Sequence, residues 1–374
     1  MDSRTSGVRL RWAFAAVLCL LCLGLLSIPR RLGSCTISSI CAQDDYSGVA
    51  SSLSSVRKFM SGTNSSSSGA GMSAEAYYEL AKLSQEMFCR DAHPLETPGV
   101  VAARIKPFPV IMYLYRNGDV VSDTLLHGNQ WEAGELKELL WALEQPLPKG
   151  FNTSQIGKDL FVDIGANVGA FLFATAARGY EVVAFEGMRS NQRLIRSGLC
   201  ASDPSVSQRV TLHGFGLGAQ PATCYIFSDP GNQGDGITMC DAANAEEAAK
   251  KAGSYVVRGT MQVHTLDSVL KRDVKAMKID VEGFEPLVLR GAKRLLEEHR
   301  VWYLMVEFNT VLLRGNARKP EEFVMELTRL GYSISSSSFN GPYLSPAELL
   351  QLGNGKDHNT NLFCVHPLLR QAKP

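Results

Sequence analysis

The stretch FVDIGANVG at residues 161–169 constrains the fold of this chain more than any other part of its 374 residues. An apolar run leads to Asp163, and Gly165 and Gly169 follow before an alanine-rich apolar run begins. Glycine allows a tight turn and lets a ligand approach the backbone closely. The stretch therefore predicts a buried strand, a ligand-binding turn and a helix in succession, as at the binding edge of open α/β sheets.

The residues after position 159 alternate between strand-like and helix-like patterns. Strands are expected at 160–164, 181–185, 210–213, 276–279 and 302–307, with helices near 169–178, 190–199, 286–297 and 321–330. Such alternation implies βαβ units, a parallel sheet and helices on both faces. Runs at 332–335 and 361–365 would complete the sheet, and β-rich runs between 223 and 265 predict an antiparallel excursion. We therefore expect an α/β fold with a doubly wound, mostly parallel, seven-stranded, Rossmann-like sheet.

The turn and the next strand together predict a cofactor site. Glu186 ends the strand at 181–185, 21 residues beyond Gly165, where an acid can bind two ribose hydroxyls. The Asp163 carboxylate can hold a cationic amino group or order water. A dinucleotide site would need glycine, to make room for pyrophosphate, where this chain has Asn167. S-adenosylmethionine has no phosphate, so Asp163, Gly165, Asn167, Gly169 and Glu186 are predicted to bind that cofactor.

Three further acids are expected at the same edge of the sheet. Asp280 and Glu282 follow the strand at 276–279, and Glu307 ends the strand at 302–307. Ligands of open α/β sheets bind beyond the carboxyl ends of the strands. These acids are candidates for a base that takes a hydroxyl proton, or for ligands of a divalent cation. The structural alternative is that Asp280 and Glu282 cap the following helix.

Several blocks of this sequence resemble the FkbM-type methyltransferases. They are DIGANVG at 163–169, AFE at 184–186 with Asn191, KIDVEGFE at 278–285, MVE at 305–307 and the upstream WE at 131–132. The resemblance implies a doubly wound methyltransferase sheet and methyl transfer to a hydroxyl group, often on a sugar. The sequence departs from the family at Gly187, where many relatives carry proline, and across 230–255.

The region before the catalytic blocks predicts a separate organisation. Residues 12–28 carry no charge, and at about 1.5 Å per residue they reach the short end of what spans a bilayer. We expect a tail at 1–11, a transmembrane signal anchor at 12–28, a Ser-rich stem at 29–72, an extension of the catalytic domain at 73–150 and a methyltransferase domain at 151–374. A cleaved signal peptide and an organelle transit peptide are the alternatives for the apolar run. In the extension, runs at 110–115 and 120–125 around Asn117-Gly118 predict a β-hairpin.

This layout predicts a single-pass membrane glycoprotein with its catalytic domain in the lumen of the Golgi or another secretory compartment. Asn64 and Asn152 begin glycosylation sequons, and a lumen would permit disulfides. The expected acceptor is a sugar hydroxyl of a glycan, and a net charge of +1 gives no reason to expect a nucleic acid partner. The alternatives are a non-catalytic, membrane-tethered glycan-binding protein and an organellar methyltransferase of a lipid or small molecule. His264 is a weaker candidate base, and 229–236 is expected to form a mobile loop over the substrate entrance.

Overall fold

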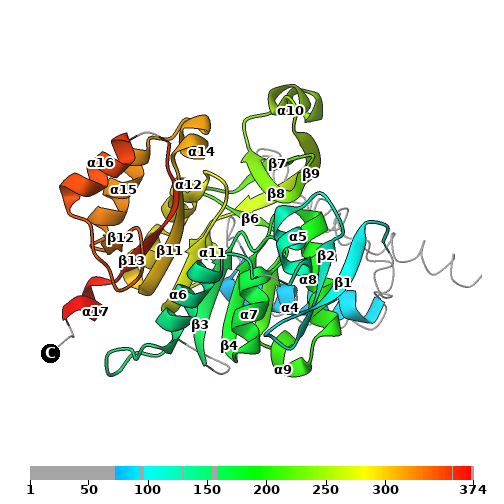
Figure 1. The fold of residues 1–374 in the computed structure, drawn as a ribbon, viewed down its shortest axis with the longest axis horizontal. Coiled ribbons are helices and arrows are strands. Elements are labelled where there is room, and N and C mark those ends of the chain that lie inside the picture. The colour runs from blue at the N-terminus through cyan, green and yellow to red at the C-terminus, as the bar shows by residue number, and fades with distance from the viewer. Residues whose placement is uncertain (1–71, 92–96, 129, 154–157, 356, 372–374) are drawn as a thin grey trace, which may run out of the picture. The chain divides into compact units, whose positions relative to one another are not determined.

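A seven-stranded sheet stands at the centre of the computed structural model, which describes residues 72–91, 97–128, 130–153, 158–355 and 357–371 (Figure 1). Within these residues its strand order is β12-β13-β11-β10-β3-β4-β5. The strands are β3 Lys158–Ile164, β4 Tyr180–Phe185, β5 Val210–His213, β10 Val274–Ile279, β11 Val301–Asn309, β12 Ser333–Ser335 and β13 Asn359–Val365. All neighbours pair in parallel except β13, which is antiparallel to both β11 and β12. The strand order therefore reverses between β3 and β10, where an open α/β sheet leaves a crevice for ligands.

Helices cover both faces of this sheet. Along β3, Phe161 packs into one apolar cluster, while Leu160, Val162 and Ile164 pack into the other, because successive side chains of a strand point to opposite faces. The first cluster includes side chains of α6 Ala133–Glu144, α7 Ala170–Ala177, α8 Arg189–Ala201 and α9 Pro204–Ser207. The second includes side chains of α4 Ala74–Asp91, α11 Leu266–Val269, α12 Glu285–Gly291, α13 Lys293–Glu298, α14 Thr310–Gly315, α15 Pro320–Arg329 and α16 Pro346–Asn354. A short helix, α17 Pro367–Gln371, follows β13.

Every residue of β4 and of β10 is buried, as expected for parallel strands covered on both faces. Two charged groups on these strands have partners away from the crevice. Lys275 forms an ion pair with Asp159 at 3.3 Å, and Glu181 pairs with Arg272. Pairing offsets the desolvation of these charges, so they belong to the packing of the sheet.

The extension before the sheet differs from the predicted hairpin. The structure pairs β1 Val100–Ile105 with β2 Val110–Tyr115, and residues from Val120 to Leu126 form helix α5. Asp119 begins this helix, because its side chain accepts a hydrogen bond from the Ser122 amide at 2.7 Å. The Asn-Gly pair therefore leads into a capped helix, and the prediction of a strand at 120–125 is wrong.

A second sheet of four strands forms the predicted antiparallel excursion. It consists of β6 Gly216–Leu217, β7 Ala222–Asp229, β8 Asn232–Met239 and β9 Val256–His264, with α10 Ala245–Ala252 between the last two. A disulfide from Cys224 to Cys240 links β7 to the segment that follows β8. A second disulfide, from Cys89 to Cys200, links α4 to α8 across 111 residues of sequence.

The predicted fold class also included a transmembrane helix at 12–28, and this part needs correction. No helix within the described residues is long and apolar enough to span a membrane. The segment 12–28 itself lies outside those residues, as do the tail at 1–11 and the stem up to residue 71. What the structure supports is the α/β sheet with its covering helices. The predicted domain boundaries at residues 73 and 150 stay predictions.

Candidate active site

The turn between β3 and α7 has the backbone that its glycines predict. Gly165 and Gly169 have φ values of +84° and +94°, which favour glycine, and Asn167 between them has +53°. A side chain at Gly165 would also collide with the carbonyl oxygen of Asp280. The end of β3 therefore lies directly against the segment that follows β10.

Glu186 holds this turn in place. Its buried carboxylate accepts hydrogen bonds of 2.7 Å from the backbone amides of Asn167 and Met188, one on each oxygen. Burial raises the pKa of Glu186 to about 7, although the two amides lower it. Each carboxylate oxygen has a second lone pair, so this side chain can still accept hydroxyl donors. The predicted ribose ligand therefore lies beside the glycine turn.

Polar atoms without partners mark the same crevice. Asp163 is 1% exposed, and neither of its carboxylate oxygens has a hydrogen-bond partner; the side-chain oxygen of Asn167 is also buried and unpaired. Burial raises the pKa of Asp163 to about 6, against the lowering effect of Lys278. Buried polar groups nearly always have partners, so these acceptors indicate the position of a ligand that donates hydrogen bonds. The ammonium and ribose hydroxyls of S-adenosylmethionine are such donors.

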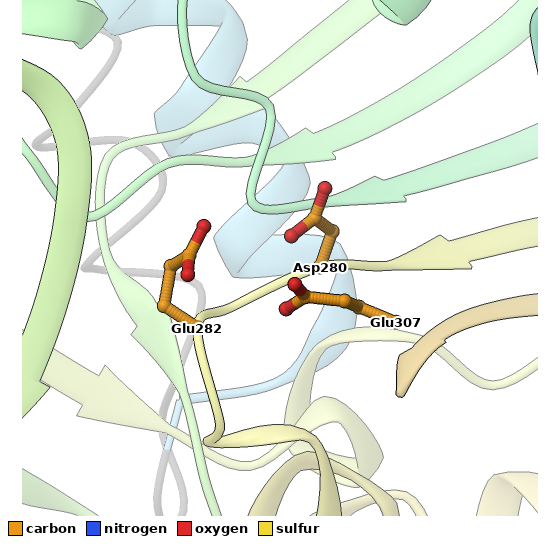
Figure 2. A group of neighbouring side chains, drawn as sticks. All are labelled: Asp280, Glu282 and Glu307. Atoms are coloured by element: carbon orange, nitrogen blue, oxygen red, sulfur yellow. The ribbon is translucent and has the colours of Figure 1, made fainter. Parts of the chain in front are cut away.

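Three carboxyl groups converge beside this crevice (Figure 2). Asp280 and Glu282 follow β10, Glu307 lies near the end of β11, and one carboxylate oxygen from each lies within 4.8 Å of the other two. Because β10 and β11 are parallel neighbours, their carboxyl ends meet at one edge of the sheet. The structure thus brings the three predicted acids together, while their role in catalysis stays a prediction.

A family model matches residues that include this edge. Residues 163–334 match the family model described as the methyltransferase FkbM domain, and the match includes Asp163, Glu186, Asp280 and Glu307. The chain carries an FkbM methyltransferase domain. This domain is that of an S-adenosylmethionine-dependent methyltransferase.

The solved structures that match this chain are distant in sequence. Methyltransferase FkbM from Methylobacillus flagellatus KT is 18% identical with a TM-score of 0.32, and the match covers 57% of this chain and 44% of that one. The glycopeptide N-methyltransferase MtfA complexed with S-adenosyl-L-methionine is 14% identical with a TM-score of 0.31, covering 64% of this chain and 96% of that one. Precorrin-6y C5,15-methyltransferase from Geobacter metallireducens GS-15 is 12% identical with a TM-score of 0.29, covering 63% and 92%. No match is found among curated protein sequences.

The three acids of this cluster differ in their electrostatic environment. Lys278 forms an ion pair with Asp280, with 2.6 Å between Nζ and Oδ2. Burial raises the pKa of Glu282 far above its usual range, and the nearby Glu307 raises it further. Burial and the charge of Asp280 likewise raise the pKa of Glu307. One ion-paired carboxylate therefore stands beside two carboxyl groups whose raised pKa values favour the protonated form.

The capping alternative for Asp280 and Glu282 does not match the contacts. Helix α12 has no side-chain hydrogen bond from its N-cap residue, Phe284. The carboxylate of Glu285 instead accepts bonds from the amides of Val281 and Gly283, at 2.9 and 3.2 Å. Glu285 thus stabilises the turn, and Asp280 and Glu282 remain directed toward the cluster.

Two acidic residues are missed by reasoning from sequence motifs. Asp235, from β8, hydrogen-bonds to Glu282, and burial raises its pKa. Asp119 accepts a bond from the Gly234 amide at 2.9 Å, while Asn191 donates one to the Gly234 carbonyl at 2.8 Å. These contacts fix part of the 229–236 segment, for which the sequence predicts a mobile loop.

His264 lies outside the acidic cluster. Its Nδ1 is 3.0 Å from the Tyr77 hydroxyl, and its ring packs against Phe215 with 4.5 Å between centroids. Burial lowers the pKa of His264. These contacts support the structural interpretation of this histidine over a role as base.

Proposed function

We propose that the FkbM domain transfers a methyl group to a hydroxyl of a sugar in a glycan. The convergence of Asp280, Glu282 and Glu307 beside the cofactor crevice carries this proposal. A hydroxyl is a weak nucleophile at neutral pH and reacts faster when a base takes its proton. A sugar also presents several oxygens, which suits a cluster that combines a proton acceptor with proton donors.

One set of side chains would bind the cofactor, and another would take the proton of the acceptor hydroxyl. Bound S-adenosylmethionine supplies a methyl group on a positively charged sulfur. Asp163, Asn167 and Glu186 would hold that cofactor, through the acceptor oxygens that they present to the crevice. Asp280 would accept the proton of the acceptor hydroxyl, which makes that oxygen a better nucleophile toward the methyl group that the cofactor would supply. The protonated carboxyls of Glu282 and Glu307 donate hydrogen bonds to neighbouring acceptor oxygens.

An open groove offers space for the acceptor. It has a volume of about 310 Å³ and begins two residues beyond Glu307 on β11. Its lining residues are Asn309, Val311, Leu312, Asp357, His358 and Asn359. Side-chain amides, a carboxylate and an imidazole suit hydroxyl groups, since each can exchange hydrogen bonds with them.

A divalent cation is the second way in which this cluster can act. Oxygens of Asp280, Glu282 and Glu307 lie close enough to share one ion, and oxygen-rich sites suit Mg²⁺. A cation there would replace the protons of the two glutamates and acidify a bound hydroxyl. Assays with chelator, and then with added magnesium, separate this mechanism from catalysis by Asp280 alone.

We also propose that the domain works in the lumen of a secretory compartment, such as the Golgi. The two disulfides support this location, because such bonds persist in oxidising compartments and are rare in the cytosol. Asn152, the sequon asparagine within the described residues, is exposed and accessible to glycosylation. A glycosidase-sensitive mobility shift that disappears in Asn64→Gln/Asn152→Gln tests the proposal, and an unshifted protein would contradict it.

Transfer of an isotopically labelled methyl group to a panel of glycans tests the proposed reaction. The full chain, expressed in cultured cells and purified, is incubated with labelled cofactor, and mass spectrometry locates the label in the product. Label on a sugar oxygen supports the proposal. Label on nitrogen refutes it, and tight cofactor binding with no transfer would favour the glycan-binding alternative.

A further inference from the structure

Glu132 occupies an unusual position at the start of α6. Its φ of +43° is left-handed, a conformation that is unfavourable for a residue with a Cβ atom. The side chain makes no capping hydrogen bond to the helix, and its Oε2 atom is buried without a partner. Neither the backbone nor the start of the helix therefore explains why a glutamate stands here.

The surroundings of Glu132 contain more acceptors than donors. Lys278 is the nearby cation. The negative charges of Asp280, Glu132 and Asp163 each raise its pKa. Asp280 forms the ion pair with this lysine, at 2.6 Å. Both oxygens of Asp163 remain unpaired although the residue is only 1% exposed. One lysine thus faces three carboxylates, and two of them hold free acceptor atoms.

These groups come from different elements but face one crevice. Asp163 and Lys278 are register partners on β3 and β10, so their side chains project from the same face of the sheet. α6 packs over this face, and it places Glu132 close enough for its charge to interact with those of Lys278 and Asp163. The unpaired acceptors therefore gather where β3 ends, beside the turn at Gly165.

We propose that Glu132 joins Asp163 in binding the α-ammonium group at the methionine end of S-adenosylmethionine. An ammonium carries three donors and no acceptor, which matches carboxylate oxygens that lack donors. Hydrogen bonds between charged groups are also stronger than neutral ones, especially away from water. The inference rests on the cofactor of the FkbM domain and is independent of the proposed glycan acceptor.

Binding measurements with three ligands test this assignment without any acceptor. S-adenosylmethionine and S-adenosylhomocysteine carry the ammonium group, whereas 5′-methylthioadenosine keeps the nucleoside and lacks the amino acid. We expect Glu132→Gln, in the full chain, to weaken binding of the first two by about tenfold or more, from the loss of one charged hydrogen bond. Calorimetry should show an unchanged Kd for 5′-methylthioadenosine.

Two further variants make the result specific. Glu144→Gln is the same change on the same helix at an exposed site, where the side chain pairs with Arg178 at 4.0 Å, so it should bind all three ligands normally. Glu132→Asp keeps the charge but withdraws it by one methylene, and should also lose affinity for the two ammonium ligands. Unchanged affinity of folded Glu132→Gln for S-adenosylmethionine would overturn the proposal. An equal loss for all three ligands would do so too, because it would show an effect of Glu132 on the fold of the crevice.

Discussion

Replacing Asp280 with asparagine separates catalysis from structural support. The variant keeps the shape of the side chain but loses its charge and its capacity to accept a proton. Loss of a general base typically slows an enzyme by about 10²–10⁴-fold. We therefore expect turnover to fall by that factor while the Kd for S-adenosylmethionine changes little.

The stability cost of this change can be estimated from the contacts of Asp280. The ion pair with Lys278 is largely buried, with side-chain exposures of 23% and 5%. Removing one partner of a buried pair costs about 3–5 kcal/mol when the other charge is left alone. Here asparagine can still accept a hydrogen bond from Lys278, and Asp163 and Glu132 remain near it. We expect a smaller loss, about 1–3 kcal/mol, the range for an altered buried hydrogen bond.

Asp159→Asn is the matched control for this experiment. Asp159 pairs with the buried Lys275 at 3.3 Å, as Asp280 pairs with Lys278, but it lies at the opposite end of the sheet. Both variants should lower the melting temperature, and only Asp280→Asn should lose methyl transfer. Full turnover in a folded Asp280→Asn protein would refute the assignment of the base and shift the search to Glu307.

Three other predictions concern the cofactor, pH and the disulfides. Glu186→Ala should weaken S-adenosylmethionine binding by about 2–4 kcal/mol in calorimetry, since two hydroxyl bonds to a charged group are lost; unchanged affinity would remove Glu186 from the site. Burial raises the pKa of Asp163 from 3.8 to about 6 and that of Glu186 from 4.5 to about 7, so the ligand-free fold binds more protons than the unfolded chain between these values and loses stability as pH rises across them. Cofactor affinity should rise over the same range, because the ionised carboxylates are the better acceptors, and parallel thermal and binding titrations would show whether the trends are opposite. Cys89→Ser/Cys200→Ser should lower the free energy of unfolding by about 2–5 kcal/mol in denaturant titrations, whereas an unchanged value would contradict a structural role.

The parallel part of the fold and its acidic edge can be predicted from the sequence. Long apolar runs alternating with amphipathic ones locate β3, β4, β10 and β11, because a buried parallel strand leaves little choice of residue. The acids that end neighbouring strands then have to meet at one edge. This is why the sequence alone is enough to group Asp280, Glu282 and Glu307.

The antiparallel parts are harder to predict because their pairing depends on partners distant in sequence. Asp235 reaches Glu282 only through the register of β7 with β8, which local patterns do not specify. The Asn117-Gly118 pair predicts a hairpin, but Asp119 caps a helix instead and β2 pairs with an upstream strand. Glu132 is singled out in the sequence only by the family resemblance, since no local rule requires a glutamate in a left-handed backbone.

The distribution of buried charge favours a binding role for the acidic edge over a packing role. Elsewhere in the sheet buried charges are neutralised in pairs, as with Lys275 and Asp159. At the crevice Lys278 faces Glu132, Asp163 and Asp280, and the pKa values of the first two acids are raised by burial. This excess of carboxyl groups over cations destabilises the ligand-free fold, because raised carboxyl pKa values mean that ionisation opposes folding. A cationic ligand would relieve this cost, so the same arrangement that weakens the empty crevice favours a cofactor with positive charge.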